Sequence, residues 1–249
     1  MIVLVTGASA GIGEKTVIKF ASLGHKVIAI ARRVEPLLKL KEQFPEFILP
    51  LVLDVTDRKS VEVLPQNLPQ AWQDIDILVN NAGLARGVDL AQDADLSDWE
   101  EVIDTNNKGL VYMTRTLLPS MLKRNHGHII NIGSIAGSWP YKGGNVYGAS
   151  KAFVRQFSLN LRTDLHGTAL RVTNIEPGLV GETEFSYVRF RGDENKAQEL
   201  YKNTQALTPE DIAESIYWAS AQPKHVNVNS IEIMPVAQTY AGLIVDRHP

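Results

Sequence analysis

The chain has 249 residues, with 28 acidic against 25 basic side chains, a formal net charge of −3 and 44% hydrophobic residues. This composition is that of a globular protein and excludes a disordered or collagen-like chain, and the small net charge argues against bulk binding to nucleic acid or to a membrane surface. The absence of cysteine excludes a disulfide framework, a thiolate nucleophile, a cysteine-ligated zinc and an iron–sulfur cluster.

Short apolar runs rich in valine and isoleucine recur along the chain and predict strands. They cover Ile2–Val5, Lys26–Ala31, Ile48–Leu53, Ile75–Val79, His128–Ile132, Leu170–Ile175 and Ile231–Met234. Amphipathic stretches between them predict helices over Gly11–Leu23, Glu35–Phe44, Ser60–Asn67, Trp99–Arg124, Tyr147–His166 and Pro209–Ala221. Two helix starts carry capping signals, one at Ser97 with Glu100 and one at Thr208 before Pro209.

Strand and helix alternate throughout, which predicts an α/β fold with a seven-stranded parallel sheet, doubly wound, and helices on both faces. No linker or composition shift divides the chain, so we expect a single domain over residues 1–249. The least regular segment, Gly178–Glu199, reads as a long loop with one short helix. Loops of that length are often lids, and we expect a substrate loop at about 178–199.

No segment indicates export or a membrane span. The apolar run that starts at Met1 ends after Val5, which is too short for a secretory signal. No run of about 18 apolar residues exists. We therefore expect a cytoplasmic protein.

The turn after the first strand is rich in glycine and leads directly into the first helix. It reads Thr6-Gly7-Ala8-Ser9-Ala10-Gly11-Ile12-Gly13. Glycines let a phosphate approach the backbone, and free N–H groups at a helix start attract an anion. A strand before the turn and a helix after it are the context of a dinucleotide site. The alternative is a turn that merely reverses the chain.

Two arginines, Arg32 and Arg33, follow the second strand. An NAD site usually has an acid here for the ribose 2′-hydroxyl, whereas arginine accommodates a 2′-phosphate. The pair therefore favours NADP over NAD, with solvated arginines at a helix start as the alternative. Glu35 could neutralise one of the two charges.

Polar residues also follow the third and fourth strands, where ligands bind in open α/β sheets. Asp54 precedes Val55 and is a candidate to bond an adenine amino group, or simply to cap a turn. In the segment Asn80-Asn81-Ala82-Gly83, Asn81, Ala82 and Gly83 could line the cofactor. The alternative is that the two asparagines brace neighbouring strands.

Tyr147 and Lys151 are four residues apart on a predicted helix and share one face. Ser134 follows the fifth strand, and Asn106 lies in the long helix before it. A cation within about 4–6 Å stabilises a phenolate and lowers its pKa, which makes tyrosine usable as a base. Each residue alone is better explained by packing or solvation, but together, downstream of the phosphate turn, they favour a catalytic site.

These motifs together resemble the classical short-chain dehydrogenase/reductase family over essentially the whole chain. The segments Gly133–Tyr141 and Glu176–Val180 are most similar to NADP-dependent 3-hydroxy acid dehydrogenases, also described as serine or L-allo-threonine dehydrogenases. The resemblance implies a Rossmann fold, a homotetramer and hydride transfer between NADP and the CH–OH group of a small 3-hydroxy acid. Serine, allo-threonine and 3-hydroxypropanoate are substrates of that type.

The resemblance also implies residue roles. Tyr147 acts as general base in oxidation and general acid in reduction. Lys151 lowers the pKa of Tyr147 and bonds the nicotinamide ribose, Ser134 holds the substrate oxygen, and Asn106 keeps a water beside Lys151. The backbone after the sixth strand wraps the nicotinamide, and a threonine reaches its carboxamide or a phosphate; these residues are Pro177, Gly178, Leu179, Val180 and Thr183.

A hydroxy acid needs a cation for its carboxylate, preferably a forked arginine. The loop offers Arg189 and Arg191, although solvated loop charges explain them equally well. The histidines show no metal-ligand spacing, so we predict no metal. Two other functions stay open: a reductase of larger carbonyls such as ketoacyl thioesters, and a non-catalytic NADP-binding sensor.

Overall fold

The computed structural model describes residues 1–240. A parallel sheet of seven strands forms its centre, in the order β3-β2-β1-β4-β5-β6-β7. Each predicted strand is present, with its ends within two residues of the predicted ones. The strands are β1 Ile2–Thr6, β2 Lys26–Ala31, β3 Ile48–Val52, β4 Ile77–Asn80, β5 His128–Ile132, β6 Arg171–Pro177 and β7 Ser230–Ile233.

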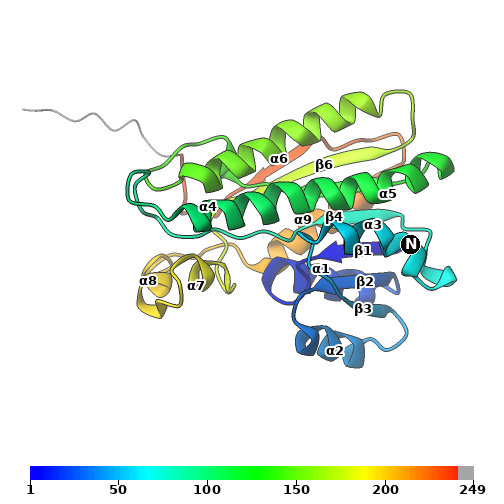
Figure 1. The fold of residues 1–249 in the computed structure, drawn as a ribbon, viewed down its shortest axis with the longest axis horizontal. Coiled ribbons are helices and arrows are strands. Elements are labelled where there is room, and N and C mark those ends of the chain that lie inside the picture. The colour runs from blue at the N-terminus through cyan, green and yellow to red at the C-terminus, as the bar shows by residue number, and fades with distance from the viewer. Residues whose placement is uncertain (241–249) are drawn as a thin grey trace, which may run out of the picture.

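Helices cover both faces of the sheet, which confirms the predicted α/β fold (Figure 1). One face packs against α1 Gly11–Ser22, α2 Val34–Gln43 and α9 Pro209–Ser220. The other packs against α3 Arg58–Asn67, α5 Leu110–Arg124 and α6 Asn145–Asp164.

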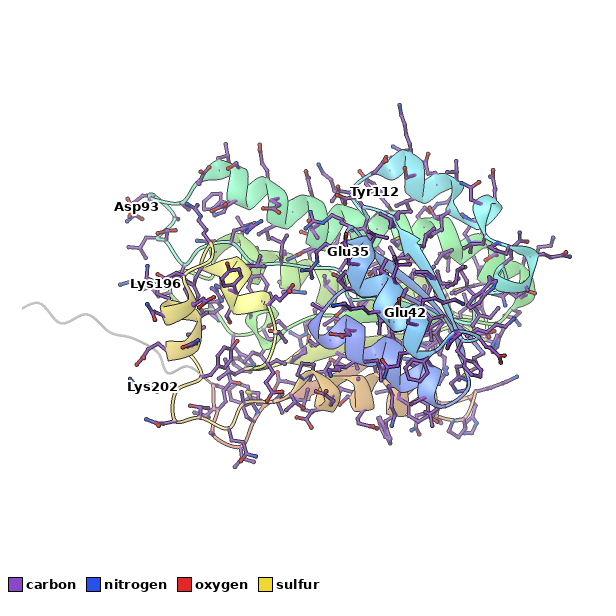
Figure 2. All side chains as sticks on the ribbon, turned by 90° about the horizontal axis from the view of Figure 1, so that it is seen from below. Glu35, Glu42, Asp93, Tyr112, Lys196 and Lys202 are labelled. Atoms are coloured by element: carbon purple, nitrogen blue, oxygen red, sulfur yellow. The ribbon has the colours of Figure 1, made fainter. Side chains whose placement is uncertain are left out.

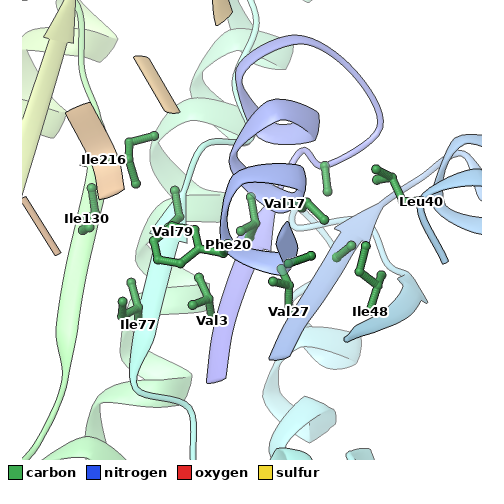
Figure 3. Packing of buried hydrophobic residues seen from close by; sticks show 14 of the residues in the cluster. Val3, Val17, Phe20, Val27, Leu40, Ile48, Ile77, Val79, Ile130 and Ile216 are labelled. Carbon is green, nitrogen blue, oxygen red and sulfur yellow. The ribbon is translucent and has the colours of Figure 1, made fainter. Parts of the chain in front are cut away.

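Alternation along each strand builds these two cores. Val3 and Val5 of β1 face α1, whereas Leu4 between them faces the opposite layer. Phe20 of α1 lies directly over the strands beside Val3 and Val79 (Figure 3) and is 0% exposed. Replacing such a phenylalanine by alanine lowers the free energy of unfolding by about 3–5 kcal/mol.

The topology places a ligand site at one edge of the sheet. Strand β1 pairs with β2 on one side and with β4 on the other. Successive strands are therefore added in one direction from β1 to β3 and in the opposite direction from β4 to β7, and the order switches between β1 and β4. In open α/β sheets, the crevice outside the carboxyl ends of the strands at this switch point binds the ligand.

The long helix predicted over residues 99–124 is interrupted. It consists of α4 Leu96–Ile103, a π-helical turn at Asp104–Gly109 and α5. The predicted capping box at Ser97 was wrong, because the helix begins earlier and Asp95 caps it by accepting a hydrogen bond from the Ser97 N–H at 2.9 Å. At α9, by contrast, Thr208 is the N-cap as predicted.

The segment after β6 forms two short helices, where the sequence predicted one. They are α7 Phe185–Arg189 and α8 Glu194–Glu199, the second capped by Asp193. Both lie beyond the carboxyl ends of the strands, apart from the two helical layers (Figures 1 and 2). Short 3-10 turns occur at η1 Gln70–Trp72 and η3 Ile135–Gly137. Within residues 1–240, no helix combines the length and hydropathy needed to cross a bilayer.

Candidate active site

A cavity of about 760 Å³ follows the carboxyl ends of the strands. It extends from Arg33 after β2 to Tyr147 on α6, with α7 along one side. The predicted residues that line it are Gly7, Ser9, Ala10, Gly11, Ile12, Arg32, Arg33, Asp54, Val55, Asn81, Ala82, Gly83, Ser134, Tyr147, Lys151, Pro177, Gly178, Leu179, Val180, Thr183 and Arg189.

Four predicted residues do not line the cavity. Ala8 is fully buried, and its N–H donates to the carbonyl of Ile30 at 2.9 Å. Gly13 packs against the turn, since a Cβ there would lie 2.2 Å from the Gly7 carbonyl oxygen. Ala8 and Gly13 therefore shape the glycine-rich turn but do not line the cavity. Asn106 and Arg191 also lie outside the lining.

The glycine-rich turn has the backbone that close approach of a phosphate requires. Gly7 and Gly11 have φ values of 67° and 54°, which disfavour a side chain. Ala10 is the N-cap of α1 and supplies no side-chain hydrogen bond to the first turn. The N–H groups at the start of α1 therefore carry the positive end of the helix dipole into the cavity with no side-chain cap.

Arg33 is held by an acid that the sequence did not indicate. Its Nη1 and Nη2 donate to the carboxylate of Glu184 at 3.1 and 2.7 Å, and Nη2 also donates to the Ser9 hydroxyl at 3.1 Å. The expectation that Glu35 neutralises an arginine was wrong for Arg33, because its partner Glu184 comes from the segment 178–199, which we call the lid segment. Arg32 is exposed and lines the cavity beside it.

Asp54 and Asn81 make structural hydrogen bonds and also line the cavity. Asp54 accepts from the N–H and hydroxyl of Thr56, at 2.9 and 2.8 Å, and also faces the cavity. Asn81 Nδ2 donates to the carbonyls of Thr6 and Gly7, at 2.9 and 3.2 Å. Asn81 therefore fixes the glycine-rich turn against β4 while lining the cavity.

Ser134, Tyr147 and Lys151 meet at the opposite end of the cavity. Ser134 and Tyr147 both line this end, and the Ser134 hydroxyl lies close enough to the phenol to favour a lower pKa of Tyr147. Lys151 Nζ lies 5.9 Å from the centroid of the Tyr147 ring and donates to the Ile132 carbonyl at 2.8 Å. The helix spacing and the end of β5 thus bring a hydroxyl, a phenol and an ammonium group together.

Burial is the largest cause of the shifted pKa values of Tyr147 and Lys151. It raises the pKa of Tyr147 to about 12, against the lowering effects of the Ser134 hydroxyl and the nearby Arg189 charge. It also lowers the pKa of Lys151 to about 8. Lys151 is not among the groups that shift the pKa of Tyr147, so the expectation that Lys151 lowers this pKa when the cofactor is bound stays a prediction.

Asn106 acts on the backbone next to these residues. It lies in the π-helical turn, where its Oδ1 accepts from the Leu84 N–H at 2.8 Å. Its Nδ2 donates to the Leu84 carbonyl at 2.9 Å and to the Ser150 hydroxyl at 3.0 Å. Both amide hydrogens are thus used within the protein, and Asn106 fixes the segment that begins at Gly83.

The lid segment separates the two candidate arginines. Arg189 points into the cavity, with its guanidinium carbon 5.7 Å from the Tyr147 ring centroid and its Nη2 donating to the Tyr141 hydroxyl at 2.9 Å. Arg191 pairs instead with Asp98 on α4. The geometry therefore favours Arg189 over Arg191 as a group that meets a substrate.

Sequence patterns did not indicate three residues that line the cavity, namely Glu184, Phe185 and Gln238. Glu184 and Phe185 carried no motif beyond their place in the loop, and Phe185 lies 5.6 Å from Tyr147 between ring centroids. Gln238 accepts from the Leu179 N–H at 2.8 Å and gave no signal at all. Within residues 1–240, no three histidine or acidic side chains gather in a group that could hold a metal ion.

Comparison with known proteins identifies the family. The model of the short chain dehydrogenase family matches residues 1–193. The chain belongs to this family. The curated relatives of this short-chain dehydrogenase include the NADP-dependent 3-hydroxy acid dehydrogenase YdfG of Escherichia coli (strain K12), 64% identical over 99% of this chain and 100% of that protein. They also include the serine 3-dehydrogenase of Agrobacterium fabrum, 47% identical over 98% of each chain.

Solved structures of related proteins agree with the fold. A structure described as the closed form of serine dehydrogenase complexed with NADP+ superposes with a TM-score of 0.98, at 64% identity and 100% coverage of both chains. Serine dehydrogenase from Escherichia coli gives a TM-score of 0.86 at 58% identity, covering 96% of this short-chain dehydrogenase and 100% of that chain. The resemblance predicted from the motifs and the Rossmann-type fold are both confirmed.

Proposed function

We propose that this protein transfers hydride between NADP and a small 3-hydroxy acid, as the names of its relatives say of them. The observation that carries the proposal is one cavity with an anion site at one end and Ser134, Tyr147 and Lys151 at the other. Bound NADP supplies the carbon that accepts or donates the hydride. The protein supplies orientation and proton transfer.

The residues present fit a phosphorylated dinucleotide. The start of α1 offers N–H groups with no side-chain cap for the diphosphate, and Arg32 with Arg33 offers cations for a 2′-phosphate. Asp54 faces the same cavity for the adenine. Thr183 lies over the turn, because a Cβ on Gly11 would meet its methyl group at 3.1 Å, and we place it beside the diphosphate.

Tyr147 carries the proton in this proposal. In reduction, its hydroxyl donates a proton to the carbonyl oxygen as the carbon receives hydride, and a pKa near 12 keeps that proton in place at neutral pH. In oxidation, the hydroxyl proton of the substrate passes to the phenolate, which positive charge in the complex must favour. Ser134 holds the same substrate oxygen, and Lys151 holds the ribose and adds positive charge.

Arg189 is the proposed partner of the substrate carboxylate. It reaches the cavity within 5.7 Å of the Tyr147 ring, so the carboxylate and the hydroxyl of a short acid span the gap between them. A forked guanidinium binds a carboxylate through two parallel hydrogen bonds. The segment from about 178 to 199 is accordingly proposed as the substrate loop of a single domain over residues 1–249.

Asn106 is proposed as a positioning residue. Its three hydrogen bonds fix Leu84 and Ser150, one residue from Gly83 and Lys151 respectively. A Cβ on Gly83 would lie 3.5 Å from Lys151 Nζ, so the backbone that Asn106 fixes borders the ammonium group. The water expected beside Lys151 stays a prediction.

A homotetramer in the cytoplasm is the further part of the proposal. Phe153 and Leu159 on α6 are 42% and 44% exposed, and Trp218 on α9 is 55% exposed, which supports association of copies of this chain through these helices. Sedimentation or light scattering in solution tests this part. A monomer at micromolar concentration would contradict it.

The test of the function is spectrophotometric reduction of NADP, with NAD in parallel. The substrates are D- and L-serine, the threonine isomers, 3-hydroxypropanoate and 3-hydroxybutyrate. We expect turnover of several of these acids with NADP and much less with NAD. Activity confined to ketoacyl thioesters would favour a reductase of larger carbonyls, and tight NADPH binding without any turnover would favour a sensor.

A further inference from the structure

The lid segment is tied to the cofactor end of the cavity by one ion pair. Glu184, the residue before α7, accepts from both terminal nitrogens of Arg33 at 3.1 and 2.7 Å. The two side chains are 50% and 52% exposed. Arg33 and Glu184 are 151 residues apart in sequence. Their contact therefore joins two distant segments that both line the cavity.

The donors in this pair are those that a 2′-phosphate needs. The guanidinium group of Arg33 is planar, and its edge with the two terminal nitrogens can bind one anion through two parallel N–H···O hydrogen bonds. Glu184 occupies both terminal nitrogens, and Ser9 shares the second of them at 3.1 Å. A phosphate that binds Arg33 through this fork therefore has to replace the carboxylate of Glu184.

The lid does not depend on this contact alone. The Gly87 N–H donates to the Arg189 carbonyl at 2.8 Å, and Arg86 Nη1 donates to the Val188 carbonyl at 3.1 Å. Arg191 pairs with Asp98 on α4. The lid can therefore stay docked over the active site while Glu184 releases Arg33.

We propose that Glu184 is a specificity-determining residue that competes with the 2′-phosphate of the cofactor for Arg33. The inference rests on the proposed use of NADP. A half-exposed ion pair is weak, and a phosphate monoester carries nearly two charges, so the exchange favours the phosphate without making its binding tight. Glu184 thereby weakens the binding of cofactors that carry the 2′-phosphate and leaves others unaffected, and its return to Arg33 assists release of the product cofactor.

Calorimetric titration with 2′,5′-ADP and with 5′-AMP tests this inference without any turnover. We expect Glu184→Gln to tighten the binding of 2′,5′-ADP by about threefold to tenfold, more at low salt, because one competing charge is removed. Binding of 5′-AMP should stay within about twofold, since it has no group for Arg33. Glu184 is exposed, so the variant is expected to fold.

Two controls separate competition from a general charge effect. Glu182→Gln removes the same charge from the same exposed loop, at a residue whose charge acts on Lys15 and not on Arg33, and should leave both dissociation constants unchanged. In an Arg33→Gln background, the effect of Glu184→Gln should disappear, because the two side chains act on each other.

Unchanged or weaker binding of 2′,5′-ADP to Glu184→Gln would overturn the inference, and it would leave the proposed cofactor standing if the unaltered protein binds 2′,5′-ADP. Failure of the unaltered protein to bind 2′,5′-ADP at all would overturn the proposed cofactor, and this inference with it. An equal effect of Glu182→Gln would also overturn it, since simple loop charge would then explain the result.

Discussion

The guanidinium group of Arg189 lies over the ring of Tyr147, 5.7 Å from its centroid. Arg189 comes from α7 and Tyr147 from α6, so the position of α7 brings a cation to the proposed proton donor. In the proposed function, Arg189 is therefore both the partner of the substrate carboxylate and a positive charge beside Tyr147, and the segment that carries it forms part of the active site.

Arg189 is expected to determine the affinity for the substrate acid. Replacing it by methionine should raise the KM for a hydroxy acid by about 10- to 100-fold, since a hydrogen-bonded charge contributes about 1.5–3 kcal/mol. Arg191→Met is the matched control, because Arg191 pairs with Asp98 outside the cavity. Steady-state kinetics on both variants check this. An equal rise in KM for Arg189→Met and Arg191→Met would show that the affinity depends on the net charge of the lid segment and not on a contact of Arg189.

Tyr147→Phe is expected to lower kcat by about 100- to 10,000-fold, the range for loss of a general acid or base. Phenylalanine keeps the ring that packs against Phe185 and removes only the hydroxyl near Ser134. Binding of NADPH, followed by fluorescence, should change little. Retention of most of the activity would assign the proton to another group.

The pH dependence should differ between the two reaction directions. Oxidation needs Tyr147 as the phenolate, and burial raises its pKa to about 12, so its deprotonated fraction grows as pH rises. We expect kcat/KM for oxidation to rise by up to about tenfold per pH unit below about pH 8, where Lys151 keeps its charge, and kcat for reduction to stay nearly flat over the same range. Initial rates over that range check the sign. An oxidation rate that falls with rising pH would contradict it.

The cap of α4 offers a test of stability. Asp95→Ala removes the side chain that accepts from the Ser97 N–H and should cost about 1 kcal/mol, or about 2–4 °C in Tm. Ser97→Ala removes only a hydroxyl and should cost less. Thermal unfolding followed by circular dichroism compares the two. A larger loss at Ser97 would restore Ser97 as the cap.

Strands and the glycine-rich turn could be predicted because their signals are local. Runs such as Lys26–Ala31 are apolar on both faces, as a buried parallel strand requires. Strand β2 begins and ends at the residues predicted from this run. Tyr147 and Lys151 face one cavity because residues four apart on a helix share a side. Gly7 and Gly11 adopt the positive φ values that glycine permits.

The other features depend on contacts between distant segments. The ion pair of Arg33 and Glu184 joins residues 151 apart, which no local pattern indicates. The π-helical turn at Asp104–Gly109 keeps the apolar pattern of the helices on either side, so the sequence reads as one helix. The pKa of Tyr147 depends on how fully water is removed from the phenol, which only the packed structure determines.

The central claim is that hydride passes from carbon 3 of a hydroxy acid to NADP on this protein. The most direct measurement uses 3-hydroxypropanoate with deuterium at carbon 3 and mass spectrometry of the reduced cofactor. We expect NADPH that carries one deuterium, and at least about 100-fold less of it when Tyr147→Phe replaces the unaltered protein at matched times. Turnover that leaves the NADPH unlabelled would contradict the account.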